Sequence, residues 1–133
     1  MADTRSGGCL CGAVRFTVTG PVTGPTACHC RECQRQSGNY WAAVSAPSDR
    51  VEITGPVAWI SVSALARRGF CPHCGGFLFW QPADGSSVDM GLGNLDDPAG
   101  LALVDHLWCD EATLPVPDDG TPHYRRGRPK PAG

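Results

Sequence analysis

Apolar and polar residues alternate over short stretches along most of the chain. Val14, Phe16 and Val18 alternate with less apolar residues, which gives the period of two expected of a half-buried strand. Similar patterns predict strands at residues 40–45, 50–54, 57–62, 77–81, 88–92 and 101–108. Gly-Pro and Asp-Pro pairs separate several of these stretches and are typical of turns. The sequence therefore predicts a mainly β fold made of many short strands.

Helical signals are few. One short helix is predicted at residues 31–37, and Gly38 ends it. No long apolar stripe with a helical period occurs elsewhere in the sequence. The pattern therefore disfavours helical bundles and parallel α/β folds.

The chain has 133 residues, which is the size of one domain. Hydrophobic residues make up 41% and charged residues 18%, so the chain is apolar enough to form a core. No run of eighteen apolar residues occurs, and the first residues, MADTRSGG, lack the apolar core of a signal peptide. We therefore expect a soluble cytoplasmic protein that does not enter a membrane.

Eight cysteines are the main chemical feature of the sequence. Seven of them fall into close groups with the patterns C-x-C, C-x-C-x-x-C and C-x-x-C, while Cys109 stands alone. Disulfides do not persist in a reducing compartment, and such groups are then typical of metal sites. Buried apolar cysteines would not need this spacing, and a redox pair would be expected in a β-α-β context that the sequence lacks. Metal ligation is therefore the leading interpretation.

The first and last groups are suited to a closed metal site. Cys71 and Cys74 have the spacing of a zinc knuckle, and the glycines after them allow backbone N–H groups to face the thiolates. Cys9 and Cys11 reach a common ion only if the backbone bends, which Gly12 allows. Together the two pairs would form one four-thiolate site that joins the N-terminal segment to the middle of the chain.

The middle group, Cys28, Cys30 and Cys33, supplies three thiolates within six residues and no obvious fourth ligand. This pattern is typical of a zinc site that keeps one position for water or substrate. Zinc with three thiolates is suited to binding and deprotonating an incoming thiol. The alternative is a second structural site, whose fourth ligand would be one of three residues, His29, His73 or Cys109. His106 and His123 have no partner spacing, and we expect structural or surface roles for them.

Basic residues are unevenly distributed along the chain. The net charge is −2, but residues 1–124 hold seven basic and thirteen acidic side chains and so carry −6. The Pro-rich residues 125–133 contain Arg125, Arg126, Arg128 and Lys130 and resemble an A·T-hook arm. Because an acidic body binds nucleic acid poorly, we favour a solvated, flexible tail. The alternative function is a non-catalytic, zinc-stabilised binding module with a weak DNA-contacting tail.

Four segments of the sequence resemble the glutathione-dependent formaldehyde-activating enzyme family, which includes the centromere protein V-like proteins. They are residues 8–16 (GCLCGAVRF), 28–33 (CHCREC) with Ser37-Gly38, 68–75 (RGFCPHCG), and 93–98 (GNLDDP) with His106. The resemblance covers about residues 7–124. We therefore divide the chain into an N-terminal extension (1–6), a zinc-binding domain (7–124) and a basic tail (125–133).

The resemblance implies small coiled antiparallel sheets with little helix, called a β-tent, stapled by a structural zinc ion. It implies two zinc ions per chain, one structural at Cys9, Cys11, Cys71 and Cys74 and one catalytic at Cys28, Cys30 and Cys33. The implied activity is that of a carbon–sulfur lyase that combines glutathione with formaldehyde, or another small carbonyl, into a thiol adduct. Because glutathione is anionic, we assign substrate binding to the basic residues nearest the cysteine groups in sequence, Arg31, Arg35, Arg67 and Arg68.

Overall fold

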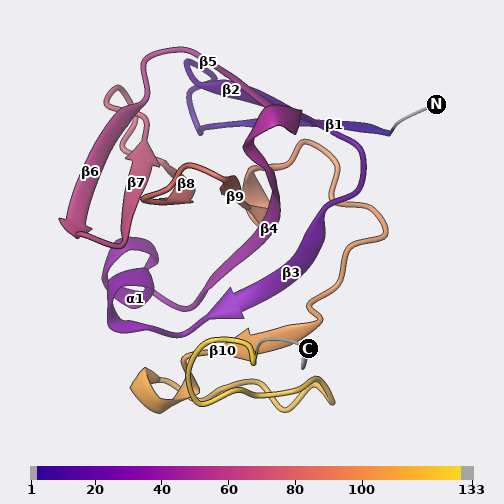
Figure 1. Cartoon of the computed structure of the whole chain (residues 1–133), viewed down its shortest axis with the longest axis vertical. Coiled ribbons are helices and arrows are strands. Elements are labelled where there is room, and N and C mark those ends of the chain that lie inside the picture. Colours follow the sequence, from indigo (N-terminus) through magenta and orange to yellow (C-terminus); the bar gives the residue numbers. More distant parts are fainter. Residues whose placement is uncertain (1–2, 130–133) are drawn as a thin grey trace.

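The computed structural model describes residues 3–129 (Figure 1). Within this range the chain forms ten strands, one α-helix and three short 3-10 helices. The strands are β1 (Thr4–Gly8), β2 (Arg15–Thr19), β3 (Thr23–Cys28), β4 (Trp41–Pro47), β5 (Val51–Thr54), β6 (Ala58–Ser63), β7 (Ala66–Phe70), β8 (Phe77–Pro82), β9 (Ser87–Gly91) and β10 (Asp105–Leu107). The helices are α1 (Arg31–Ser37), η1 (Ser48–Arg50), η2 (Leu92–Asn94) and η3 (Cys109–Glu111).

The strands form two sheets. The smaller sheet has the order β1-β2-β5 and is antiparallel. The larger sheet has the order β10-β3-β4-β9-β8-β7-β6 and is antiparallel except at one edge, where β10 runs parallel to β3. This edge differs from the antiparallel sheets expected, because the chain returns to β3 through the long connection at residues 95–104. In Figure 1 the smaller sheet lies at the top and β10 at the bottom of the view.

β4 shows why the two faces of the larger sheet differ. Successive side chains of a strand point to opposite faces. Val44 and Ala46 are buried in the main core with Phe16 of β2. Trp41 and Ala43 belong to a second apolar cluster, which contains cysteines of the middle group. The core therefore covers one face of the sheet, and the other face is free to form a site.

Most elements agree with the sequence pattern. α1 spans the predicted residues, with Cys30 as its N-cap and Gly38 as a left-handed C-cap at φ 87°. Strands β2, β4, β5, β6, β8 and β9 confirm the alternating stretches, whereas only Asp105–Leu107 of the predicted strand at 101–108 is extended. The pattern does not predict β1, β3 or β7, because TRSGG, TGPTAC and ARRGF do not alternate.

The N-terminal end takes part in the smaller sheet. β1 begins at Thr4 and pairs with β2, with Thr4 opposite Thr19. Residues 4–6 are therefore part of the fold, although the sequence suggests an extension.

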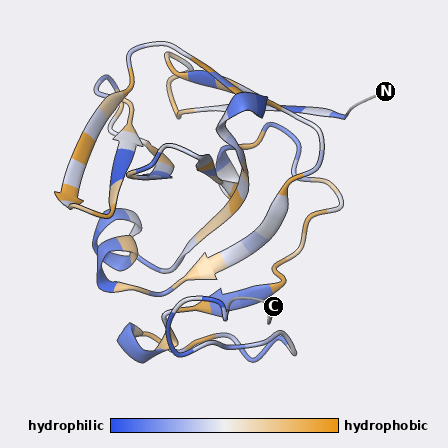
Figure 2. Cartoon of the chain, viewed as in Figure 1, coloured by the Kyte–Doolittle hydropathy of each residue, from blue (hydrophilic) through white to orange (hydrophobic). Residues whose placement is uncertain are grey.

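The C-terminal segment also packs against the rest of the chain. The N–H of Trp108 donates to the carbonyl of Arg126 over 2.9 Å, and the N–H of Asp110 donates to that of Arg125 over 3.0 Å. Figure 2 shows that this segment is largely hydrophilic, so polar contacts hold it in place. Residues 125–129 thus differ from the flexible tail that the sequence suggests, and Lys130 lies outside the described residues.

Candidate functional site

Four cysteines from distant parts of the chain lie together: Cys9, Cys11, Cys71 and Cys74. Their sulfurs lie within 4.8 Å of one another. The sulfurs of Cys9 and Cys11 are 3.7 Å apart, and those of Cys11 and Cys71 are 3.8 Å apart. Sulfurs bound to one tetrahedral ion lie roughly 3.8 Å apart. The group, called here the four-cysteine group, therefore fits a closed metal site.

Two glycine-containing turns bring these sulfurs together. After β1, the N–H of Gly12 donates to the carbonyl of Cys9 over 3.2 Å, and Gly12 has φ 81°. After β7, the N–H of Gly75 donates to the carbonyl of Cys71 over 2.7 Å, and Gly75 has φ 76°. Glycine adopts this left-handed conformation without steric cost, so the chain can turn sharply at both places.

Backbone N–H groups favour the thiolate form in the four-cysteine group. The nitrogen of Val14 lies 3.3 Å from the sulfur of Cys9. Burial alone would raise the pKa of Cys9, but this N–H and the neighbouring thiols lower it to about 6. The backbone of Gly76 is the main cause that lowers the pKa of Cys74. Cys9 and Cys74 are therefore prepared to release protons to a metal ion. For Cys11 the backbone of Ala13 lowers the pKa, but burial and the other thiols outweigh it and raise the pKa to about 11.

Cys28, Cys30 and Cys33 form a second group, called here the cysteine trio, whose sulfurs also lie within 4.8 Å of one another. Cys28 ends β3, and Cys30 caps α1, accepting the N–H of Cys33 over 3.4 Å. Cys33 is buried in α1, and the other two are half-buried. The turn from strand to helix therefore gathers the three sulfurs around one point. All eight cysteines are free thiols.

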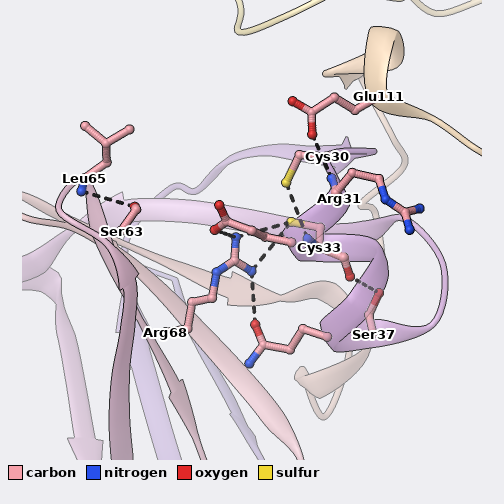
Figure 3. Close-up of polar contacts among 10 residues, drawn as sticks. Cys30, Arg31, Cys33, Ser37, Ser63, Leu65, Arg68 and Glu111 are labelled. Atoms are coloured by element: carbon pink, nitrogen blue, oxygen red, sulfur yellow. Dashed lines mark hydrogen bonds and ion pairs between the residues drawn. The ribbon is translucent and has the colours of Figure 1, made fainter.

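A buried arginine faces the cysteine trio (Figure 3). Arg68 lies on β7, and its Nη1 and Nη2 atoms are 3.8 and 3.9 Å from the sulfur of Cys33. Bonds to Gln36 over 3.0 Å and to Glu32 over 3.3 Å hold the guanidinium in place. A cation at this distance stabilises thiolates and offsets the negative charge of three thiolates around a divalent ion.

The thiols of the trio change one another's protonation. Contacts with Cys28 and Cys33 lower the pKa of Cys30, and the charge of Arg68 adds to this effect. Contact with Cys30 raises the pKa of Cys28. Cys30 therefore loses its proton more readily than Cys28.

A cavity of about 490 Å³ opens beside the cysteine trio. This volume is typical of small-molecule sites. The strand register aligns side chains of the larger sheet along its wall: Ser45 lies opposite Asp89, which in turn lies opposite Trp80. Trp80 lies opposite Arg68. One row of side chains thus runs from the middle of the sheet to the arginine that faces the trio.

Two tryptophans give the cavity apolar walls near the trio. Trp41 lies opposite Cys28 in the pairing of β3 with β4, and its ring centroid is 4.5 Å from that of Phe77. Trp41 and Trp80 both line the cavity. Apolar walls limit the water that can approach the trio, and a thiolate is less solvated there.

The structure brings one of the four predicted substrate-binding arginines to the cavity. Arg68 lines it, whereas Arg67 lies over the ring of Trp59, with its guanidinium carbon 3.9 Å from the ring centroid. Arg31 and Arg35 are exposed on α1 and do not line the cavity. Closeness in sequence to the cysteines therefore did not place these three side chains beside the site.

None of the three candidate fourth ligands joins the trio within residues 3–129. His73 is exposed in the turn of the four-cysteine group. Cys109 is half-buried in η3, and its N–H donates to the carbonyl of Tyr124 over 3.0 Å. The Nε2 atom of His29 lies 2.8 Å from Nδ1 of His106. Within the described chain, the trio therefore offers three ligands to a metal.

His106 extends this contact away from the trio. Its Nε2 atom lies 2.7 Å from Oδ2 of Asp119, and the ligand atoms of His106, Asp119 and His123 lie within 4.8 Å of one another. The hydroxyl of Thr121, followed by His106, lowers the pKa of Asp119. The two histidines that stand alone in the sequence are therefore close in space. A hydrogen-bonded chain leads from Asp119 through His106 to His29.

Three charged residues of the cavity, Asp89, Glu111 and Arg128, are not part of the cysteine motifs. Asp89 lies between Val88 and Met90, and a polar residue between two buried apolar ones is the signal that could have identified it. Burial raises the pKa of Asp89 to about 6. Arg128 has no comparable signal, because its position depends on how the C-terminal segment folds.

Comparison with known proteins connects this site to a family. The sequence model of the glutathione-dependent formaldehyde-activating enzyme family matches residues 4–111, which include both cysteine groups. The chain belongs to this family. At the level of the family, the match supports a glutathione-related, formaldehyde-activating function.

A solved structure of a protein from Rhodobacter sphaeroides is similar to this chain, with a TM-score of 0.60 and 19% sequence identity. The similarity covers 89% of this chain and 98% of that chain, and it shows a shared fold. The comparison with curated proteins gives no match. Within residues 3–129, no helix has the length and apolar character that crossing a bilayer requires.

Proposed function

We propose that this protein is a zinc-dependent enzyme of the carbon–sulfur lyase type, which joins and separates the sulfur of glutathione and the carbon of formaldehyde or another small carbonyl. The contrast between the two cysteine groups carries this proposal. The four-cysteine group completes a tetrahedral set, whereas the trio supplies three thiolates and borders a cavity of about 490 Å³. Catalytic zinc sites keep one position open in this way.

Zinc fits both sets of ligands. Thiolates are among its preferred ligands, and the sulfur separations of 3.7 and 3.8 Å in the four-cysteine group suit its tetrahedral geometry. We therefore expect two zinc ions per chain, one structural and one catalytic. When bound at the trio, zinc would lower the pKa of an incoming thiol and so supply a thiolate at neutral pH.

The chain's own residues would support this chemistry. Arg68 offsets the negative charge of the trio, because its guanidinium lies 3.8 Å from the sulfur of Cys33. Trp41 and Trp80 limit water beside the reacting sulfur. A weakly solvated thiolate is the more reactive nucleophile, so both features favour attack on a carbonyl carbon.

The reaction needs no oxidant or reductant. The glutathione sulfur donates an electron pair to the carbonyl carbon, and the electron pair of the C=O double bond moves to the oxygen. The oxygen takes up a proton to replace the one that the thiol released. Reversal of these steps breaks the carbon–sulfur bond and returns the two reactants.

A non-catalytic binding module with a DNA-contacting tail is the alternative function. Arg125 Nε lies 3.0 Å from Oδ1 of Asp110, and Arg128 Nε lies 2.7 Å from Oδ2 of Asp105. These ion pairs reduce the positive charge that the tail offers to phosphates. They therefore favour the enzyme over the binding module.

Exchange at equilibrium tests the proposed function, because formaldehyde and glutathione also combine without a catalyst. Exchange NMR measures how fast the hydroxymethyl group moves between free and adduct forms in three samples: without protein, with the zinc-loaded protein, and with its Cys30→Ser variant. We expect faster exchange only with the unaltered protein. Equal rates in all three samples would exclude this substrate pair.

A further inference from the structure

Asp89 is a half-buried carboxylate on the cavity wall. It lies on β9 between Val88 and Met90, whose side chains belong to the main core, so the alternation of the strand directs Asp89 to the cavity. Its cross-strand neighbours on this face, Ser45 and Trp80, carry no charge. The Ser45 side chain and the charge of Arg128 partly offset the effect of burial on Asp89. Burial disfavours its charged form and raises its pKa to about 6, but the carboxylate is still ionised at neutral pH. A carboxylate in this position is suited to bind a cationic group.

Arg128 brings a cation to the same cavity. Its Nε and Nη2 atoms donate to the carboxylate of Asp105 over 2.7 and 3.1 Å, and Nη2 also donates to the hydroxyl of Thr26 over 2.7 Å. Nη1 takes part in none of these bonds. Asp105 is buried on β10, so the fold fixes the orientation of the guanidinium. The pair with Asp105 reduces the net charge of the guanidinium but leaves its Nη1 N–H groups to donate to a second carboxylate.

Along β4, the anchor of Arg128 lies nearer to the cysteine trio, and Asp89 lies farther from it. On β4, Trp41 lies opposite Cys28, and Ser45 lies opposite Asp89. Four residues of a strand span roughly 13 Å, which separates the row of Asp89 from the row of the trio. Thr26, the hydroxyl that anchors the guanidinium, belongs to the row between them. A molecule that reaches all three groups must therefore be extended.

We propose that Asp89 and Arg128 bind the α-amino-acid end of the substrate thiol, the ammonium on Asp89 and the carboxylate on Arg128, while its sulfur reaches the trio. This inference rests on the proposed function and specifies its substrate class as thiols whose zwitterionic end lies on an extended arm. The γ-glutamyl end of glutathione has this form. Free cysteine does not, because its charged groups are attached to the carbon next to the one that bears sulfur. Arg128 lies outside the family match of residues 4–111, so the match does not include this contact.

Glutathione and two analogues, each of which lacks one of its charged groups, test this assignment. Glutathione carries both groups, glutaryl-Cys-Gly lacks only the ammonium, and 4-aminobutyryl-Cys-Gly lacks only the α-carboxylate. Calorimetric titration of the zinc-loaded protein measures the affinity of each peptide. This readout does not depend on catalysis, so it separates recognition of the thiol from the reaction.

The variants are chosen so that a purely structural role gives a different result. Asp89→Asn removes one charge from the cavity wall. Arg128→Gln is combined with Asp105→Asn, so that no buried carboxylate loses its partner. Arg125→Gln is the matched control, because Arg125 also pairs with an aspartate but does not line the cavity.

We expect the unaltered protein and the Arg125→Gln control to bind glutathione about tenfold more tightly than either analogue, as a charge-assisted hydrogen bond allows. Asp89→Asn should abolish the preference for glutathione over glutaryl-Cys-Gly and keep the preference over 4-aminobutyryl-Cys-Gly. The double variant should keep the first preference and abolish the second. Equal affinity of the unaltered protein for all three peptides, or an equal loss for all three in each variant, would overturn the inference. The protein could show these ligand preferences, each lost in only one variant, and still not catalyse the exchange of formaldehyde. In that case the proposed function fails and the binding assignment stands.

Discussion

The Nη1 atom of Arg68 lies 3.8 Å from the sulfur of Cys33, and the arginine side chain is only 5% exposed. A buried guanidinium keeps its charge, so a permanent cation stands beside the cysteine trio. Three thiolates around a divalent ion carry a net charge of about −1. In the metal-bound trio Cys33, which Arg68 contacts, is a thiolate, whereas in the metal-free trio Cys30 loses its proton most readily; Arg68 therefore favours the metal-bound form.

Arg68→Gln should lower the zinc affinity of the trio about tenfold or more, because a partly buried charge interaction of this length is worth roughly 1–3 kcal/mol. Competition with a chelator measures the loss of one of the two zinc ions. Arg67→Gln is the control, since Arg67 precedes Arg68 on β7 but does not line the cavity. Equal zinc retention in both variants would contradict the role given to Arg68.

Replacing one cysteine of the four-cysteine group should destabilise the fold, whereas replacing one cysteine of the trio should not. Cys71→Ser should unfold or aggregate the protein, because a structural zinc site supplies on the order of 10 kcal/mol, as much as the whole stability of a small domain. Cys30→Ser should leave the fold intact and remove one of two zinc ions. Circular dichroism and elemental analysis of the same samples measure both effects. A folded, zinc-retaining Cys71→Ser protein would contradict the assignment of the structural site.

The cysteine spacing predicted which sulfurs lie together within each motif, because short motifs restrict where neighbouring sulfurs can lie. The C-x-x-C turn and the helix start at Cys30 both depend on local residues, including Gly75 and Gly38. The alternating strands were predicted for the same reason. Strands such as β7 (Ala66–Phe70) were not, because their pairing partners rather than their own pattern make them extended.

The cavity could be predicted only in small part. Its walls come from the register between strands far apart in sequence, which places Arg68 opposite Trp80 and Trp80 opposite Asp89. Arg128 reaches the cavity through an ion pair with Asp105, a contact between the C-terminal segment and β10 that no local pattern predicts. Proximity in sequence was therefore a poor guide to which arginines border the site.

Asp89→Asn should make the protein more stable at neutral pH. The pKa of Asp89 is raised from 3.8 to about 6 in the folded chain, so above pH 6 the folded state carries the cost of a buried charge that the unfolded state does not. Removing that charge should raise the free energy of unfolding at pH 7.5 by about 1–3 kcal/mol. The gain should shrink as the pH falls from 6 to 4, because the native residue is then protonated in the folded state. Thermal unfolding across this pH range measures it, and a gain that does not change with pH would be inconsistent with a titrating Asp89.

A chain that ends at Tyr124 should be less stable than the full chain. It lacks Arg128, so the buried carboxylate of Asp105 loses its ion pair, at a cost of roughly 1–3 kcal/mol. Thermal unfolding compares the two chains, and mobility shift with A·T-rich and G·C-rich duplexes compares their DNA binding. We expect a lower melting temperature for the shortened chain and no DNA binding by either chain at near-physiological salt. An unchanged melting temperature, with DNA binding lost only on shortening, would support a DNA-contacting tail instead.

Cadmium NMR tests most directly whether the trio is an open metal site that receives the glutathione sulfur. The NMR-active isotope replaces zinc at both sites, and its chemical shift depends on the number of bound thiolates. We expect two resonances for the unaltered protein, of which glutathione shifts only one toward the position of a four-thiolate site, and we expect Cys30→Ser to lack that responsive resonance. A single resonance, or two resonances that glutathione leaves unchanged, would contradict the open site at Cys28, Cys30 and Cys33.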